Sequence, residues 1–219
     1  MADYSADLVS SRLIPVVVLD DAASAAPLAR ALVAGGLPVV EVTLRSAAAV
    51  DAIRAMVGAG LTEGLEPMLV GAGTVLTPDQ VDAAVAAGAR FIVSPGLSRA
   101  VVERCREHDV PVVAGAVTAT EVQASLELGL DLVKFFPSAT SGGRAAIKAL
   151  AAPFPQVRFI PTGGVGPDNL ADYLSLPSVP AVGGSWMVPP ELVRAGAVDE
   201  LQSLAAEAVA LAASIPEGA

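Results

Sequence analysis

Eight short apolar runs recur along the chain, and each is followed by a turn of small or hydroxylated residues and an Ala/Leu-rich stretch. The runs begin near Pro15, Pro38, Pro67, Arg90, Pro111, Asp131, Val157 and Pro180. Strands that alternate with helices at such intervals predict βαβ units and a parallel sheet. Eight units in 219 residues favour an α/β fold of the (β/α)₈ TIM-barrel type over an open doubly wound sheet. Because no linker interrupts the pattern, we predict a single domain over residues 1–219.

At the start of the chain, the sequence pattern predicts a short leading helix over residues 3–10 and a strand from Leu13 to Leu19. The strand runs into Asp20-Asp21. Ser24 is the N-cap expected for the next helix, because its hydroxyl can accept a bond from a free backbone N–H. That helix is predicted to continue through Ala34.

The second strand, predicted from Pro38 to Arg45, has one polar and one apolar face. Alternation places Glu41, Thr43 and Arg45 with Val39 on one face, and Val40, Val42 and Leu44 on the other. The apolar face suits the surrounding helices, so the polar face is expected to point into the barrel. Barrel active sites lie at the carboxyl ends of the strands, which makes Glu41 and Arg45 candidate site residues. The alternative is a structural Glu41–Arg45 ion pair that fixes strand register.

Lys134 interrupts an otherwise apolar strand pattern that spans residues 131–137. A buried ammonium without a partner is costly, and burial favours the neutral amine that can attack a carbonyl. Lys134 is therefore a candidate Schiff-base nucleophile. Its strand face also carries Phe136, an aromatic wall that would keep the amine dry. The alternative is that Lys134 reaches water from a strand end and only packs.

The small numbers of histidine, cysteine and lysine residues argue against several other kinds of catalytic site. The one histidine, His108, is expected at a solvated helix end, so neither a Ser-His-Asp set nor a histidine-rich metal site can form. The one cysteine, Cys105, excludes an internal disulfide. The only other lysine, Lys148, falls in an amphipathic segment and is expected to face solvent. We therefore predict chemistry that uses no metal and no cofactor.

The net charge and the hydropathy of the chain argue against two classes of binding partner, nucleic acids and membranes. The net charge is −10, with no basic cluster, so nucleic acid is not expected to bind. The longest charge-free run contains four prolines, which disqualifies it as a membrane span. The N-terminal residues lack the pattern of a signal peptide, so we expect a cytoplasmic protein.

Small-residue turns follow several strands. Gly71-Ala72-Gly73-Thr74 would leave backbone N–H groups and a hydroxyl open to a ligand, whereas Ser94-Pro95-Gly96 is expected to be a scaffold turn. Thr162-Gly163-Gly164 and Gly183-Gly184-Ser185 follow the seventh and eighth strands. Many barrels bind phosphate there through backbone N–H groups and a helix N-terminus. A phosphorylated ligand is therefore expected, with tight structural turns as the alternative.

Six motifs in order carry a resemblance to a known family. They are Glu41-Val42-Thr43-Leu44-Arg45, Gly71-Ala72-Gly73-Thr74, Ser94-Pro95-Gly96, Val133-Lys134-Phe135-Phe136-Pro137, Pro161-Thr162-Gly163-Gly164 and Gly183-Gly184-Ser185-Trp186. Together they resemble the 2-keto-3-deoxy-6-phosphogluconate (KDPG) and 4-hydroxy-2-oxoglutarate (KHG) aldolase family. The resemblance covers residues 13–191 and implies a class I aldolase on a (β/α)₈ barrel, usually trimeric, that releases pyruvate and glyceraldehyde 3-phosphate.

The same resemblance assigns roles to residues. It implies Lys134 as the Schiff-base lysine and Glu41 as the acid/base. The substrate-binding residues it implies are Arg45 and Thr74 for the pyruvate carboxylate, with Pro95, Phe136, Thr162, Gly163, Gly164, Gly184 and Ser185. One departure is Asp20-Asp21, where relatives often have a basic residue after the first strand. An aldolase for KHG or for the galactonate epimer, a phosphate-binding barrel isomerase or epimerase, and a non-catalytic phosphate-binding barrel stay open as alternatives.

Overall fold

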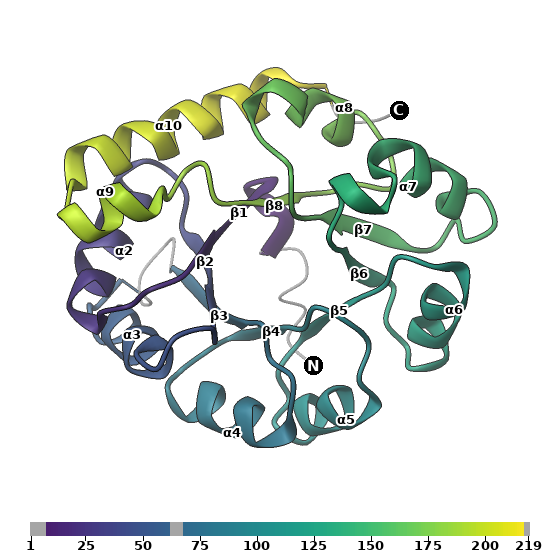
Figure 1. The fold of residues 1–219 in the computed structure, drawn as a ribbon, viewed down its shortest axis with the longest axis horizontal. Helices are drawn as coiled ribbons and strands as arrows, with labels where there is room; N and C mark the ends of the chain where they lie inside the picture. Colours follow the sequence, from purple (N-terminus) through teal and green to yellow (C-terminus); the bar gives the residue numbers. More distant parts are fainter. Residues whose placement is uncertain (1–7, 62–67, 217–219) are drawn as a thin grey trace.

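The computed structural model describes residues 8–61 and 68–216, which form a barrel of eight parallel strands inside a ring of helices (Figure 1). The strands are β1 (Leu13–Val17), β2 (Val39–Thr43), β3 (Leu69–Gly73), β4 (Phe91–Val93), β5 (Val112–Gly115), β6 (Leu132–Phe135), β7 (Arg158–Pro161) and β8 (Val182–Gly184). Neighbouring strands pair in chain order, and β8 pairs with β1. A parallel bridge between Thr162 and Gly183 joins the last two strands. The TIM-barrel prediction is confirmed, and the open-sheet alternative is wrong.

The helices of the ring alternate with the strands. They are α2 (Ala25–Ala34), α3 (Ala49–Val57), α4 (Pro78–Ala86), α5 (Arg99–Glu107), α6 (Ala119–Glu127), α7 (Gly143–Ala151), α8 (Leu170–Leu174), α9 (Pro190–Ala195) and α10 (Val198–Ser214), with 3-10 turns η1 (Ala22–Ser24), η2 (Ala139–Ser141) and η3 (Pro167–Asn169). Several begin at hydroxyl caps: Thr118 and Glu121 form a capping box at α6. None of the helices in the described ranges is long and apolar enough to cross a membrane.

Near the start of the chain, the predicted helix cap differs from the structure, whereas the leading helix agrees over its described residues. Ser24 makes no side-chain cap, because a 3-10 turn precedes α2 and the Asp21 carboxylate accepts a bond from the N–H of Ala23 at 2.9 Å. Of the predicted leading helix, residues 8–10 are helical and residues 3–7 lie outside the described residues. Leu8 on this helix is buried and closes the amino-terminal end of the barrel interior.

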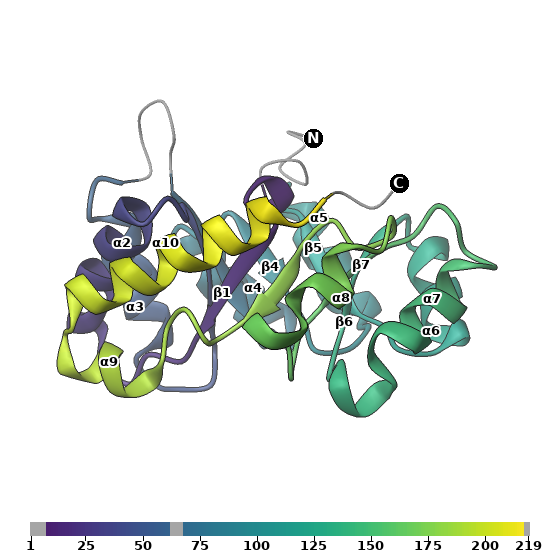
Figure 2. The same ribbon diagram turned by 90° about the horizontal axis from the view of Figure 1, so that it is seen from above.

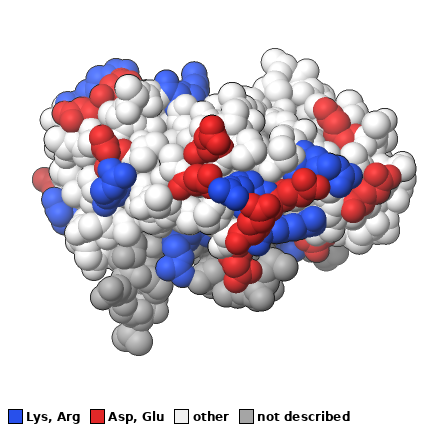
Figure 3. Space-filling model, turned by 90° about the horizontal axis from the view of Figure 1, so that it is seen from below, with Lys and Arg blue, Asp and Glu red and all other residues white. Residues whose placement is uncertain are grey.

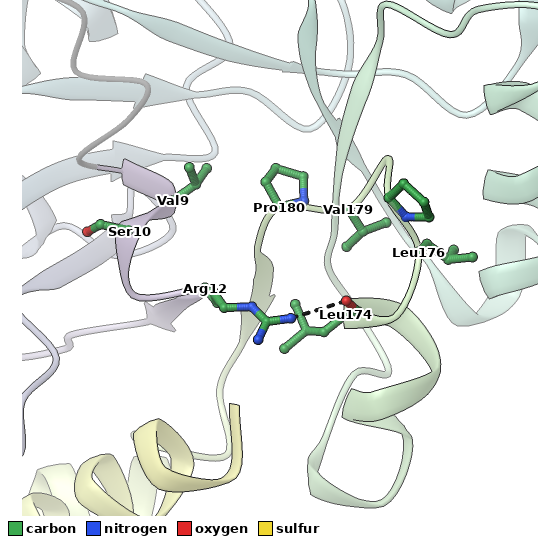
Figure 4. Close-up of a pocket in the computed structure, with 8 residues that line it drawn as sticks. Val9, Ser10, Arg12, Leu174, Leu176, Val179 and Pro180 are labelled. Atoms are coloured by element: carbon green, nitrogen blue, oxygen red, sulfur yellow. Dashed lines mark hydrogen bonds between the residues drawn. The ribbon is translucent and has the colours of Figure 1, made fainter. Parts of the chain in front are cut away.

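The amino-terminal end of the barrel is fastened to the C-terminal helix. The guanidinium of Arg12 donates to the carbonyls of Ala212 and Ile215 at 2.9 and 2.6 Å. It also donates to the carbonyl of Leu174 at 3.2 Å (Figure 4). The bonds to Leu174 and Ile215 pair carbonyls at the ends of α8 and α10, and the Ala212 carbonyl also accepts from the N–H of Ile215 at 3.2 Å. As Figure 2 shows, α10 lies along the outside of the barrel, and this anchoring holds its final turn in place.

Helices α4 and α5 carry an exposed ion network on one side of the molecule, where acidic and basic side chains are interspersed (Figure 3). Arg104 donates from Nε and from its terminal nitrogen to the two carboxylate oxygens of Asp82, both at 2.7 Å. His108, the C-cap of α5, lies 2.6 Å from the same carboxylate. The hydrogen bonds from Arg104 and His108 lower the pKa of Asp82 from 3.8 to about 2. His108 is thus an exposed helix end, as predicted.

Candidate active site

Lys134 and Glu41 meet across the interior of the barrel. Strand β6 carries Lys134 and strand β2 carries Glu41, and their side chains are 8% and 4% exposed. Nζ of Lys134 donates to Oε1 of Glu41 at 2.9 Å and lies 3.2 Å from Oε2. They are the two buried charged residues in the described part of the chain. Each is therefore the counter-charge that makes burial of the other tolerable.

This geometry decides two of the open alternatives. Lys134 does not reach water from a strand end, since its side chain points inward. Arg45 is not the partner of Glu41, and its predicted place on the inward strand face is wrong. Strand β2 ends at Thr43, and the N–H of Arg45 turns back to the Thr43 carbonyl at 2.8 Å. Arg45 consequently lies exposed in the turn after β2, and its side chain has no ion pair within the described ranges.

An aromatic ring covers the amine on the solvent side. The Phe136 ring centroid lies 5.4 Å from Nζ of Lys134, a cation–π distance, and Phe136 is 37% exposed. On the inner side, a cavity of about 10 Å³ is lined by Lys134, Glu41, Thr162 and Leu8, the residue that closes the amino-terminal end of the barrel. The amine therefore lies between a partly exposed ring and a closed interior, as the predicted aromatic wall requires.

Thr162 contributes an unsatisfied hydroxyl to this interior. Its Oγ1 is buried and has no hydrogen-bond partner in the described part of the chain. A buried hydroxyl without a partner costs free energy, so such a group at a site points to a ligand. The backbone around it is fixed, because its carbonyl accepts from the N–H of Ser138 at 2.8 Å. Its neighbours Gly163 and Gly164 have φ of 91° and 78°, which only glycine adopts easily.

The turn after β8 lies beside the Thr162 turn because Thr162 pairs with Gly183. A Cβ on Gly184 would lie 1.8 Å from the Trp186 ring, so that ring packs on the glycine backbone. Ser185 is exposed. The next helix, α9, begins only at Pro190, so no helix N-terminus follows this turn directly, contrary to expectation. Backbone N–H groups and the Ser185 hydroxyl are the donors that the turn can offer an anion.

The turns after β3 and β4 occupy the same end of the barrel. Thr74 has φ of 56°, a left-handed conformation that costs a β-branched residue about 1–3 kcal/mol and tends to occur at functional positions. A bond from the N–H of Val75 to the Val93 carbonyl at 3.1 Å holds the chain there. Pro95 is in a scaffold turn, as predicted, in which the Ser94 hydroxyl donates to Gly96 at 2.7 Å. Among the described residues, no hydrogen bond or ion pair joins Arg45, Thr74 or Pro95 to Lys134.

One part of the site was missed by the sequence prediction. Gly71, Ala72 and Gly73 belong to β3 and are not a ligand-binding turn. A Cβ atom on Gly73 would lie 2.1 Å from Oε1 of Glu41. The spacing of Gly71 and Gly73, two residues apart on one face of a strand next to the one that carries Glu41, is the signal that could have revealed this space.

The two aspartates after β1 have structural partners. Asp21 caps η1, and Asp20 lies 3.5 Å from Nε of Arg194 on α9, with both side chains exposed.

Other candidate nucleophiles are excluded by position. Lys148 is exposed on α7, as predicted, and burial raises the pKa of the Cys105 thiol to about 12.

Comparison with known proteins identifies the family. A family model described as KDPG and KHG aldolase matches residues 5–204. The chain belongs to the KDPG and KHG aldolase family. The 2-dehydro-3-deoxy-phosphogluconate aldolase of Treponema pallidum is 47% identical over 193 residues, 88% of this chain and 90% of the relative. The KHG/KDPG aldolase of Escherichia coli is 45% identical over 202 residues, 92% of both chains.

Solved structures of the family share the fold. The KDPG aldolase of Legionella pneumophila, with pyruvate captured as a covalent carbinolamine intermediate, superposes with a TM-score of 0.88 at 39% identity, covering 94% of this chain and 98% of that one. The aldolase of Zymomonas mobilis with 3-phosphoglycerate gives 0.83 at 40% identity and covers 97% of both chains. These members of the KDPG and KHG aldolase family hold a keto acid and a phosphorylated acid respectively.

Proposed function

We propose that this chain is a class I aldolase that reversibly cleaves KDPG into pyruvate and glyceraldehyde 3-phosphate. The observation that carries the proposal is the buried pair of Lys134 and Glu41, with 2.9 Å between Nζ and Oε1. A phosphate-binding isomerase needs no imine-forming lysine, and a non-catalytic barrel needs neither residue. Neither of those alternatives accounts for the cost of burying both charges.

The proposed reaction begins with attack of the Lys134 amine on the C2 ketone of the substrate. The carbinolamine loses water to give a cationic imine. A carboxylate then takes the proton of the C4 hydroxyl, the C3–C4 bond breaks, and its electron pair moves into the imine, so that the aldehyde leaves and an enamine remains. Protonation of C3 and hydrolysis release pyruvate and restore the amine. The imine is the electron sink, so the reaction requires neither cofactor nor metal.

Glu41 is proposed as the group that moves the protons. It already touches the lysine nitrogen, so each atom that gains or loses a proton forms within reach of one carboxylate. A carboxylate that first acts as base and then as acid suffices for both transfers. Phe136, over the amine, would limit entry of water during these steps.

The remaining predicted residues are proposed to bind the two ends of the substrate. Arg45 and Thr74 would bind the pyruvate carboxylate, since the exposed Arg45 guanidinium at this end of the barrel has no ion pair among the described residues. Pro95 and Phe136 would contact the reacting carbons. The phosphate would lie at Gly163, Gly164, Gly184 and Ser185, with the Thr162 hydroxyl beside it. We also propose a homotrimer, as the resemblance implies. The N-terminal pattern and the charge support the proposal of a cytoplasmic protein with no nucleic acid or membrane partner.

A panel of substrates tests the proposed preference. We expect kcat/KM to be highest for KDPG, with measurable cleavage of KHG, because relatives bear both names. The galactonate epimer and a sugar phosphate that only an epimerase would convert complete the panel. A preference for KHG or for the epimer would correct the substrate, and absence of any carbon–carbon cleavage would refute the proposed activity.

A further inference from the structure

Gly73 leaves the space in which the Glu41 carboxylate lies. In the β2–β3 register, Glu41 is opposite Gly71 and Thr43 is opposite Gly73. The Glu41 side chain therefore leans two residues toward the carboxyl end of the barrel. A Cβ on Gly73 would lie 2.1 Å from Oε1 and 2.6 Å from both Cδ and Cγ of Glu41. Real Cβ atoms essentially never come this close to another heavy atom.

Toward the amino-terminal end, the Phe91 ring occupies the position over Gly71, and only a cavity of about 10 Å³ adjoins Glu41. A Cβ on Gly71 would lie 2.2 Å from the Phe91 ring, which is fully buried. Since interiors are close-packed, little room is left for a displaced Glu41 to move toward the amino-terminal end. The carboxylate is the far end of a flexible side chain and can swing away from an added methyl group. Such a movement would carry the carboxylate away from Nζ of Lys134.

We propose that Gly73 is a positioning residue that holds the Glu41 carboxylate against the Lys134 amine by having no side chain. The inference rests on the proposed function, in which Glu41 transfers protons for an imine at Lys134. It adds a requirement: proton transfer needs an empty position on β3 as well as a carboxylate on β2. Gly73 has no direct contact with the substrate in this scheme.

The experiment is a double-mutant cycle of Gly73→Ala and Glu41→Ala, in which kcat, KM and Tm are measured for each variant. Gly73→Ala alone should lower kcat about 10²-fold, the loss typical of a misplaced acid/base, and change KM only a few-fold. In the Glu41→Ala background no carboxylate is left to displace, so Gly73→Ala should change the residual kcat less than about 3-fold. Gly35→Ala is the control, because its added methyl group meets Ala205 and Gln202 of α10 outside the strands, so its effects should be additive with those of Glu41→Ala.

The outcomes separate this inference from the proposed activity. Wild-type turnover of Gly73→Ala, or the same loss with and without Glu41, overturns the positioning role. If Gly73→Ala does not fold, the inference predicts that Glu41→Ala/Gly73→Ala folds, and failure of both overturns it. If the wild type cleaves no keto acid, the proposed function fails. The Tm cycle still tests the geometry in that case, since Glu41→Ala should relieve the destabilisation caused by Gly73→Ala.

Discussion

Replacement of Glu41 by glutamine tests the acid/base assignment with the least change of shape. Both carboxylate oxygens lie within 3.2 Å of Nζ of Lys134 in the barrel interior. Removing one partner of a buried pair typically costs about 3–5 kcal/mol of stability. The amide oxygen of glutamine can still accept a bond from Nζ. We therefore expect a smaller loss, about 1–3 kcal/mol in the free energy of unfolding.

The effect on the activation barrier should lie near or above the upper end of the effect on folding. A positioned acid/base typically contributes 10²-fold or more, so kcat should fall by at least about 10²-fold, which is about 2.7 kcal/mol in the barrier. Imine formation should persist in part, because the nucleophile is unchanged. The assay is steady-state release of pyruvate from KDPG, with urea unfolding of the same preparations.

Thr43→Val is the matched control for Glu41→Gln. Thr43 is buried on the same strand. Its hydroxyl donates to the Val17 carbonyl at 3.1 Å and not to the Lys134–Glu41 pair. Its loss should cost about 1 kcal/mol of stability and leave kcat within a few-fold of wild type. Turnover of Glu41→Gln within a few-fold of wild type would show that another group or water transfers the protons.

Two further predictions concern the phosphate end and the surface. Ser185→Ala removes one donor to a charged group, worth about 1.5–3 kcal/mol, and should lower kcat/KM for KDPG roughly 10- to 150-fold, but that for unphosphorylated KHG much less. Equal losses would make Ser185 structural. The folded pKa of Asp82 is depressed to about 2, so its pairs stabilise the fold above its unfolded pKa and are lost as pH falls from about 4 toward 2. The Tm of Asp82→Asn should therefore be lower than that of the wild type at pH 7, and the difference should shrink below pH 4. A difference in Tm that does not change with pH would contradict this dependence on the Asp82 carboxylate.

The sequence predicted the barrel because its strands are buried on both faces and recur at a regular spacing. Strand ends were less accurate, because turn hydrogen bonds decide them. The pattern of alternation continued to Arg45, but the N–H of Arg45 folds back on Thr43 and takes Arg45 off the strand. The cap of the first helix was misplaced for the same reason, since a 3-10 turn capped by Asp21 precedes α2.

The central pair of the site was only half visible in the sequence. Lys134 stood out as a charge in an apolar strand, and strand alternation pointed Glu41 inward. Their contact spans 93 positions in sequence and strands β2 and β6, so only closure of the barrel brings them together. The role of Gly73 stayed hidden because it depends on which way the Glu41 side chain leans, which no periodicity reveals.

Borohydride trapping with pyruvate tests the central claim most directly. The chain has two lysines, so peptide mapping needs to separate only Lys134, Lys148 and the terminal amine. Incubation of the native protein with both reagents should place a reduced pyruvyl group on Lys134 and abolish cleavage of KDPG, while Lys148→Arg is labelled as the wild type is. A label on Lys148, or full activity after complete labelling, would contradict an imine mechanism at Lys134.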